Sequence, residues 1–100
     1  MRAPLPAEKR FEFRDESGRG FGSAASLWEF LEALKTISAN SVQYHLQRGD
    51  FERWAGEALR DKDLGRKLRK LAHRNMRESE SMEALYSVVE GHYRELESLI

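Results

Sequence analysis

The sequence has no cysteine, which excludes disulfide bonds and metal sites built on thiolates. Its two prolines are Pro4 and Pro6, so no proline interrupts a helix or strand after residue 6. No apolar run approaches the roughly 18 residues that a membrane span needs, and residues 1–10 lack the apolar core of a signal peptide. We therefore expect a cytoplasmic protein with no membrane partner.

Residue patterns that carry catalysis are also scarce. The three histidines, His45, His73 and His92, are scattered, and the sequence has no HExxH motif, phosphate loop or nucleophile elbow. His45 and Asp50 can be imagined as an acid–base pair, but Asp50 is better explained as a helix N-cap. We expect a protein that is not an enzyme and needs no metal, cofactor or small-molecule substrate.

The charge is divided unevenly along the chain, although 17 basic and 17 acidic residues balance overall. Residues 1–77 hold 16 basic and 11 acidic residues, a balance of +5. Residues 78–100 hold one basic and six acidic residues, a balance of −5. This asymmetry suggests a body that faces a polyanion and an acidic appendage.

The hydrophobic pattern predicts an α+β fold with a small antiparallel sheet, in the order β-β-α-β-α, over residues 1–62. Residues 10–14 and 19–23 form a hairpin in this interpretation, because Phe11 and Phe13 alternate with charged residues. A capping box at residues 26–29 then begins a helix.

The second half of this body is predicted to be a strand and a helix. Residues 41–48 alternate Val42, Tyr44 and Leu46 with polar residues, which is typical of a strand with one apolar face. Asp50 would then cap the following helix.

A heptad pattern covers residues 63–100, within the same single domain. Asp61 or Asp63 can cap a helix there, and residues 75–81 interrupt the apolar rhythm. One long helix and two shorter helices are therefore both plausible. The pattern predicts a coiled coil that joins copies of the chain into a homodimer or homotetramer. The predicted interface consists of Met82, Leu85, Val89, His92, Leu96 and Leu99.

A run of basic residues lies on the first half of this region. Residues 66–77 include six basic residues and no acidic one. A helix face that carries Arg66, Lys67, Arg69 and Lys70 can neutralise phosphates and gain affinity by counterion release. The alternative is a solvated face that answers the acidic segment of a partner helix.

Aromatic residues and arginines also alternate in the predicted sheet. Sheets with aromatic faces flanked by arginines bind single-stranded nucleic acid by stacking its bases. Most of these aromatic side chains are more simply assigned to the core. Only those at the rim would be free to stack, such as Trp28, Tyr44 or a hairpin phenylalanine such as Phe21.

FEFRDESGRGFGSAASLWEFLEAL, followed by SVQYHLQRGDFERWAGEALRDKDLGRKL, resembles the N-terminal domain of the ThermoDBP family and its shorter archaeal relatives. These are non-classical single-stranded-DNA-binding proteins of thermophiles. The resemblance covers about residues 8–70. It implies a cleft for single-stranded nucleic acid and a variable C-terminal segment that builds the oligomer. The nucleic-acid contacts that it implies are Arg10, Arg14, Arg19, Tyr44, His45, Arg48 and Trp54.

The sequence therefore predicts a non-catalytic, homo-oligomeric protein that binds single-stranded DNA without sequence preference. Arginines and lysines would hold phosphates, and a few aromatic residues would stack on bases. RNA in place of DNA stays open. The alternative is a protein-interaction module, in which the heptad helix recruits a partner and the basic residues dock on an acidic protein.

Overall fold

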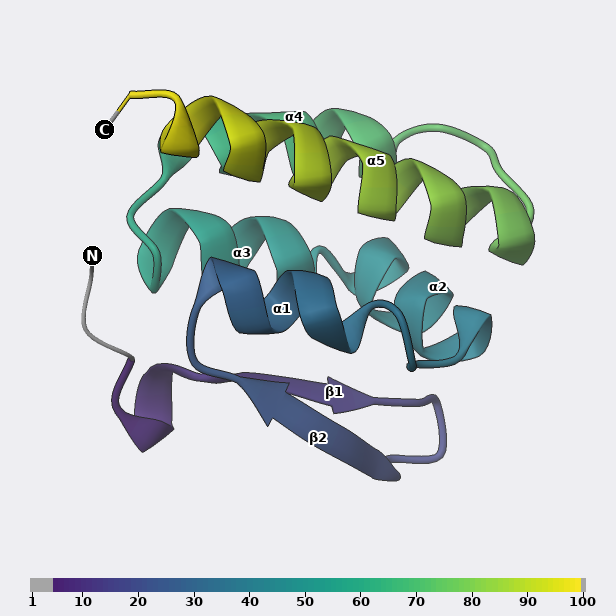
Figure 1. The fold of residues 1–100 in the computed structure, drawn as a ribbon. Coiled ribbons are helices and arrows are strands. Elements are labelled where there is room, and N and C mark those ends of the chain that lie inside the picture. The colour runs from purple at the N-terminus through teal and green to yellow at the C-terminus, as the bar shows by residue number, and fades with distance from the viewer. Residues whose placement is uncertain (1–4, 100) are drawn as a thin grey trace.

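The computed structural model describes residues 5–99 and places a β-hairpin on one side of a set of helices (Figure 1). Its antiparallel pair of strands, followed by helices, confirms the α+β class. None of the helices in the described part of the chain is long and apolar enough to cross a membrane. In chain order the elements are a 3-10 helix (Ala7–Lys9), β1 (Phe11–Arg14), β2 (Gly20–Ala24), α1 (Leu27–Ala33), α2 (Ala39–Arg48), α3 (Asp50–Glu57), α4 (Lys62–Ala72) and α5 (Glu78–Glu97).

The hairpin presents one apolar face to the helices. Phe11 pairs with Ala24 and Phe13 with Gly22, and both phenylalanines are buried. The register shifts after Phe13, so Phe21 is an extra residue in β2. Such a bulge re-aims the side chain that it carries, and Phe21 is 42% exposed. The hairpin thus covers one side of the core and leaves the ring of Phe21 on the surface.

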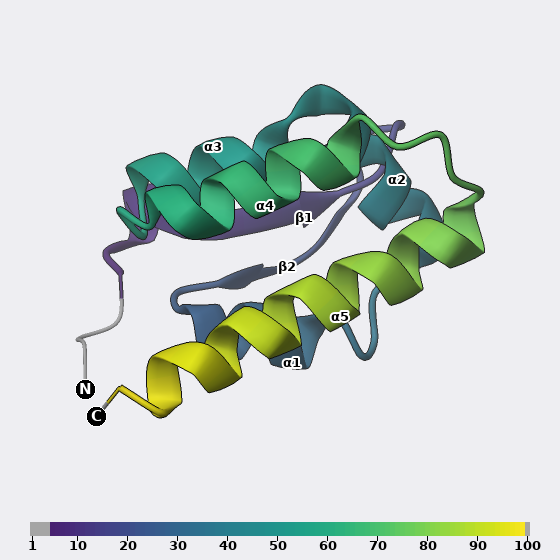
Figure 2. The ribbon, with the colours of Figure 1, turned by 90° about the horizontal axis from the view of Figure 1, so that it is seen from above.

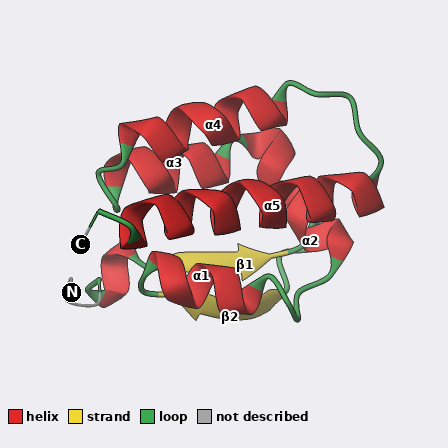
Figure 3. Cartoon of the chain, turned by 45° about the horizontal axis from the view of Figure 1, so that its top comes forward, coloured by secondary structure: helices red, strands yellow, loops and turns green. Residues whose placement is uncertain are grey.

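The third strand predicted over residues 41–48 is wrong, because this segment is helix α2 (Figure 3). Ser38 caps α2 by accepting a hydrogen bond from the amide of Ser41. The buried side chains of α2 then recur at helical spacing, one turn apart. The hydroxyl of Ser41 donates to the carbonyl of Arg14 (2.6 Å), and His45 Nε2 accepts from the amide of Arg14 (2.7 Å). Two side chains of helix α2 therefore hydrogen-bond to the backbone of Arg14, at the end of β1.

Gly49 joins α2 to α3. It ends α2 in the left-handed conformation, with φ of 74°, which suits glycine far better than other residues. Asp50 is the first residue of α3, and its side chain makes no capping hydrogen bond, so its prediction as an N-cap is wrong. The carboxylate of Asp50 accepts instead from His45.

The heptad region consists of two helices, with α4 ending at Ala72 and α5 beginning at Glu78. Asp61 caps α4, as one of the two predicted alternatives, by accepting from the amide of Leu64 (3.0 Å). Seen from above, α4 and α5 lie side by side (Figure 2), and α5 also packs on α1 and α2.

One core joins both predicted segments of the chain. Its aromatic centre consists of Phe11, Phe13, Phe30, Phe51 and Trp54. Phe30 is 1% exposed and stacks on Trp54, with ring centroids 5.2 Å apart. Leu85 and Val89 of α5, both fully buried, belong to the same cluster. The C-terminal helix therefore completes the core of its own chain.

Candidate nucleic-acid interface

A basic face runs along the solvent side of α4. Arg66, Arg69 and Lys70 are exposed, and spacings of three and four residues set them on the side opposite the buried leucines of this helix. Arg74 continues the face just beyond the end of α4. Within residues 5–99, no acidic side chain forms an ion pair with these four cations. We call Arg66, Arg69, Lys70 and Arg74 the basic face.

A hollow of about 440 Å³ lies between α4 and α5, beside the basic face. Lys70 and Arg74 stand on its α4 side, and Leu71, Val88 and Gly91 line it as well. Its volume is in the range of about 300–1,000 Å³ that small-ligand sites occupy. The hollow thus combines apolar walls with cations that no carboxylate neutralises.

Lys67 closes the other end of this hollow and is engaged within the chain. Its ammonium group lies 3.0 Å from His92 Nδ1, 3.2 Å from a carboxylate oxygen of Glu95 and 3.5 Å from one of Asp63. Burial alone would lower the pKa of Lys67, but Glu95 and Asp63 raise it above its usual value. One ligand atom each from Asp63, His92 and Glu95 lies within 4.8 Å of the others, as at a metal site. In this structure the ammonium group of Lys67 serves as their cation.

His92 ties the start of α4 to α5. Because Lys67 donates to Nδ1, the ring hydrogen lies on Nε2, which donates to the carboxylate of Asp61 (2.6 Å). Asp61 also caps α4. His92 is 3% exposed, so both ring nitrogens are used inside the protein. Its role is to fix the two helices that border the hollow.

His45 plays the corresponding role between the hairpin and the turn from α2 to α3. Nδ1 lies 2.8 Å from the carboxylate of Asp50, and Nε2 accepts from the amide of Arg14. Arg48 and Arg53 also bind Asp50. His45 is 3% exposed and meets the edge of Phe11. Both ring nitrogens are therefore engaged, and neither is left for proton transfer.

A second hollow, of about 180 Å³, opens outside this pair and is lined by Arg14, Tyr44 and Arg48 among others. The guanidinium of Arg48 lies over the ring of Tyr44, 5.1 Å from its centroid. A cation–π contact of this kind occupies one face of the ring. Tyr44 is thus a weaker stacking platform than the sequence suggests.

Acidification should destabilise the fold through His45. Burial lowers its pKa below the usual value; Asp50 raises it and Arg48 lowers it further. Because the folded pKa is the lower one, the unfolded chain binds more protons below about pH 6.5, and stability falls there as pH falls. We expect a loss of up to about 1.4 kcal/mol between pH 7.5 and 5.5, measured by urea unfolding.

His45→Gln is the matched control for this prediction, because it keeps an amide in place of the ring and retains His73 and His92. Its stability at pH 7.5 should be lower than that of the wild type, and its change between the two pH values smaller. An equal pH dependence in both proteins would assign the effect to another group.

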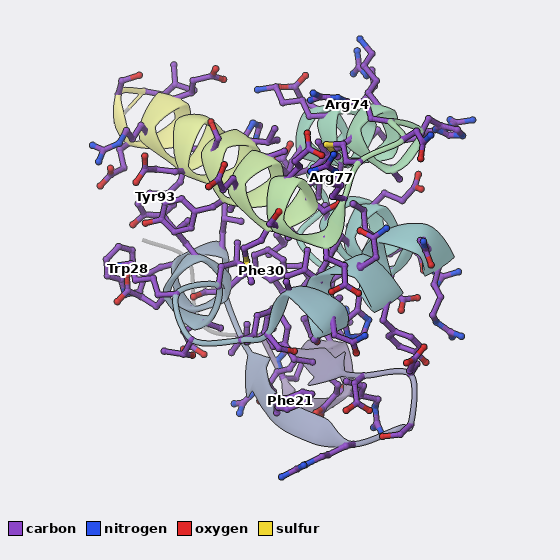
Figure 4. All side chains as sticks on the ribbon, turned by 90° about the vertical axis from the view of Figure 1, so that its right-hand side faces the viewer. Phe21, Trp28, Phe30, Arg74, Arg77 and Tyr93 are labelled. Carbon is purple, nitrogen blue, oxygen red and sulfur yellow. The ribbon has the colours of Figure 1, made fainter. Side chains whose placement is uncertain are left out.

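The predicted nucleic-acid contacts lie on several separate surfaces. Arg10, Arg14, Arg19 and Phe21 belong to the hairpin, at the opposite edge of the molecule from Arg74 (Figure 4). Trp28 lies on α1, 51% exposed, and its ring meets Tyr93 of α5 at 5.7 Å (Figure 4).

Two of the predicted contacts lie in the core. Trp54 is 9% exposed and donates from Nε1 to the carbonyl of Lys9 (2.8 Å), and His45 is buried as described. Trp54 stacks on Phe30 in the aromatic centre, and both ring nitrogens of His45 are hydrogen-bonded within the chain. Neither side chain has a face on the surface for a base.

The residues predicted to form the oligomer interface include both buried and exposed side chains. Leu85, Val89 and His92 are buried within the chain, and Met82 is partly buried against the core. A buried position cannot also meet a second copy, so Leu85, Val89 and His92 are corrected to core positions. Met82 keeps a partly exposed side chain. Leu96 and Leu99 remain exposed, at 37% and 80%.

The sequence prediction missed the hollow and two residues that line it, Val88 and Gly91. Arg74 lies in the basic run of the sequence, and a glycine inside a helical pattern is the one local signal that could have singled out residue 91. The hollow itself depends on how α4 and α5 pack. Comparisons of the chain with protein-family models, with curated proteins and with solved structures found no match.

Proposed function

We propose that this protein binds single-stranded nucleic acid along the basic face of α4. The observation that carries the proposal is the set of four exposed cations without ion-pair partners in the described chain. A cation that already pairs with a carboxylate gains little from a phosphate, whereas a free one releases the counterions of the phosphate that it meets. The function is binding without chemistry.

The position of the hollow favours a single strand over a duplex. Its apolar walls, Leu71 and Val88, adjoin Lys70 and Arg74. A flexible strand can place a phosphate on these cations and turn a base toward the apolar surface, whereas the bases of a duplex are stacked and paired. The resemblance of residues 8–70 to the ThermoDBP family is in agreement with this ligand.

The separation of acidic and basic residues between α5 and α4 supports a binding track along α4. The six glutamates between Glu78 and Glu97 belong to α5, whereas the basic face belongs to α4 and the loop after it. An acidic helix repels the backbone of a strand, and a basic one attracts it. A bound strand would therefore follow α4 and stay off the exposed side of α5.

Titration of a labelled oligothymidylate of about 16 nucleotides by fluorescence anisotropy tests the proposal. Four phosphate contacts at a slope of about −0.7 each predict an affinity about 50-fold weaker at 200 mM than at 50 mM salt. A duplex of the same length should bind more weakly than the single strand. No binding at 50 mM salt, or binding that salt does not weaken, would reject the proposal.

A second function, self-association or protein docking, is favoured by one observation. Trp28 and Tyr93 meet on the surface, and Leu96 lies one helical turn beyond Tyr93 with Leu99 farther along. We call these four residues the apolar end. Exposed aromatic and leucine side chains that gather in one place are typical of interaction sites. Light scattering would detect a homo-oligomer formed there.

A further inference from the structure

Gly91 lies in the middle of α5, where a glycine needs an explanation. Glycine destabilises a helix interior relative to alanine, because it has more backbone freedom to lose on folding. The backbone of Gly91 does not have a positive φ, and a Cβ added there would meet no atom within 4 Å. Neither conformation nor packing therefore requires glycine. Its distinguishing feature is that it lines the hollow between α4 and α5.

We propose that the hollow is a base-binding site, in which one unstacked base of a single strand lies against Gly91, Leu71 and Val88. This inference rests on the proposed function. Gly91 is exposed, and a Cβ added there would meet no atom within 4 Å, so a planar ring can lie close to the helix backbone. Leu71 is 2% exposed and forms the floor of the hollow, so it offers the ring little surface. The contact is apolar and shape-based, so it accepts different bases.

The charges around the hollow orient the bound nucleotide. Arg74 and Lys70 stand toward one end, and Lys67 and Glu95 toward the other. Lys67 is neutralised by Glu95 and Asp63, whereas Lys70 and Arg74 have no carboxylate partner among the described side chains. A phosphate is therefore attracted to the Arg74 end and repelled by Glu95. The base lies between the two ends, over Gly91.

Gly91→Leu tests the site by filling it, and Gly91→Ala is the matched control. Both variants remove the glycine from the helix, and both should unfold at higher urea concentration than the wild type. The isobutyl group of leucine occupies the place of the base, whereas a methyl group leaves most of it open. Circular dichroism confirms that each variant keeps its helices.

Binding is compared for an oligothymidylate and an abasic strand of equal length, which carries the same phosphates without bases. The wild type and Gly91→Ala should bind the thymidine strand about 10-fold more tightly than the abasic one. Tenfold is about 1.4 kcal/mol, which corresponds to roughly 55 Å² of apolar surface buried at about 25 cal/mol per Å². Gly91→Leu should lose this preference and keep the affinity for the abasic strand within about twofold.

The outcomes separate the site from the function. If Gly91→Leu keeps the preference for the thymidine strand, the base-binding site is wrong. If the wild type binds both strands equally, the site is wrong while single-strand binding stands. If the wild type binds neither strand, the proposed function fails and the site fails with it.

Discussion

Changing Arg66, Arg69 and Lys70 together to glutamate should weaken binding of single-stranded DNA by at least about 100-fold at 50 mM salt. Two unit charges about 4 Å apart interact by about 1 kcal/mol in water, so each reversal shifts the energy by up to about 2 kcal/mol before screening. Three such sites exceed the roughly 2.7 kcal/mol that 100-fold requires. All three side chains are exposed, so the variant should keep the unfolding midpoint of the wild type.

The control reverses the same number of charges on the hairpin, at Arg10, Arg14 and Arg19. These three arginines are among the contacts that the resemblance implies, and the hairpin segment that carries them lies away from α4 (Figure 1). If the strand follows the basic face, the hairpin variant should lose less than about fivefold, because its charges act through a screened distance. A greater loss in the hairpin variant than in the α4 variant would move the binding track to the hairpin.

The two variants compare two predicted surfaces: the basic run, predicted from its charge pattern, and the hairpin arginines, implied by the resemblance. The cations of residues 66–70 could be placed on one helix face from their spacing alone, and α4 carries them there, whereas Arg74 and Arg77 lie beyond the end of α4 at Ala72. Lys67 is the exception, since Glu95 comes from 28 residues away and neutralises it. Local spacing predicts which side of a helix a residue takes, but not which distant residue it meets.

Helix α2 shows the same limit in the fold. Ser41 and His45 looked like the polar face of a strand, and only the tertiary contact with Arg14 explains why a helix buries them. Their hydroxyl and imidazole satisfy the amide and carbonyl of one strand residue, as a neighbouring strand would have done. Alternation over eight residues therefore predicted the wrong conformation for this segment.

The two His–Asp pairs also depend on tertiary contacts that the local sequence does not predict. The sequence offers His45 and Asp50 as a conceivable acid–base pair, and the structure adds a second pair, His92 with Asp61. In the structure both ring nitrogens of His45 and of His92 form hydrogen bonds within the chain. Their common function is to close a junction between elements: hairpin to α2 in one case, and α4 to α5 in the other. The hollow beside the basic face depends on the second junction.

The heptad pattern leads to the largest expected effect on stability, from Leu85→Glu. Leu85 is 0% exposed, so the change removes a packed side chain and buries a carboxylate. The lost packing costs about 2–5 kcal/mol, and the unpaired charge adds several more. Together they approach the whole stability of a 100-residue domain, about 5–15 kcal/mol. We expect the variant to lose its cooperative unfolding transition by circular dichroism.

Leu99→Glu is the control on the same heptad row, two heptads farther along the chain from Leu85. Its side chain is 80% exposed, so the change in stability should stay within about 0.5 kcal/mol. Since Leu99 belongs to the apolar end, any oligomer that forms there should lose mass in light scattering. A folded Leu85→Glu variant of lower mass would instead mean that α5 contacts a second copy. In that case the apolar heptad positions of α5 would pack against a second copy of the chain. The burial of Leu85 instead indicates that they pack against α1, α2 and α4 of the same chain.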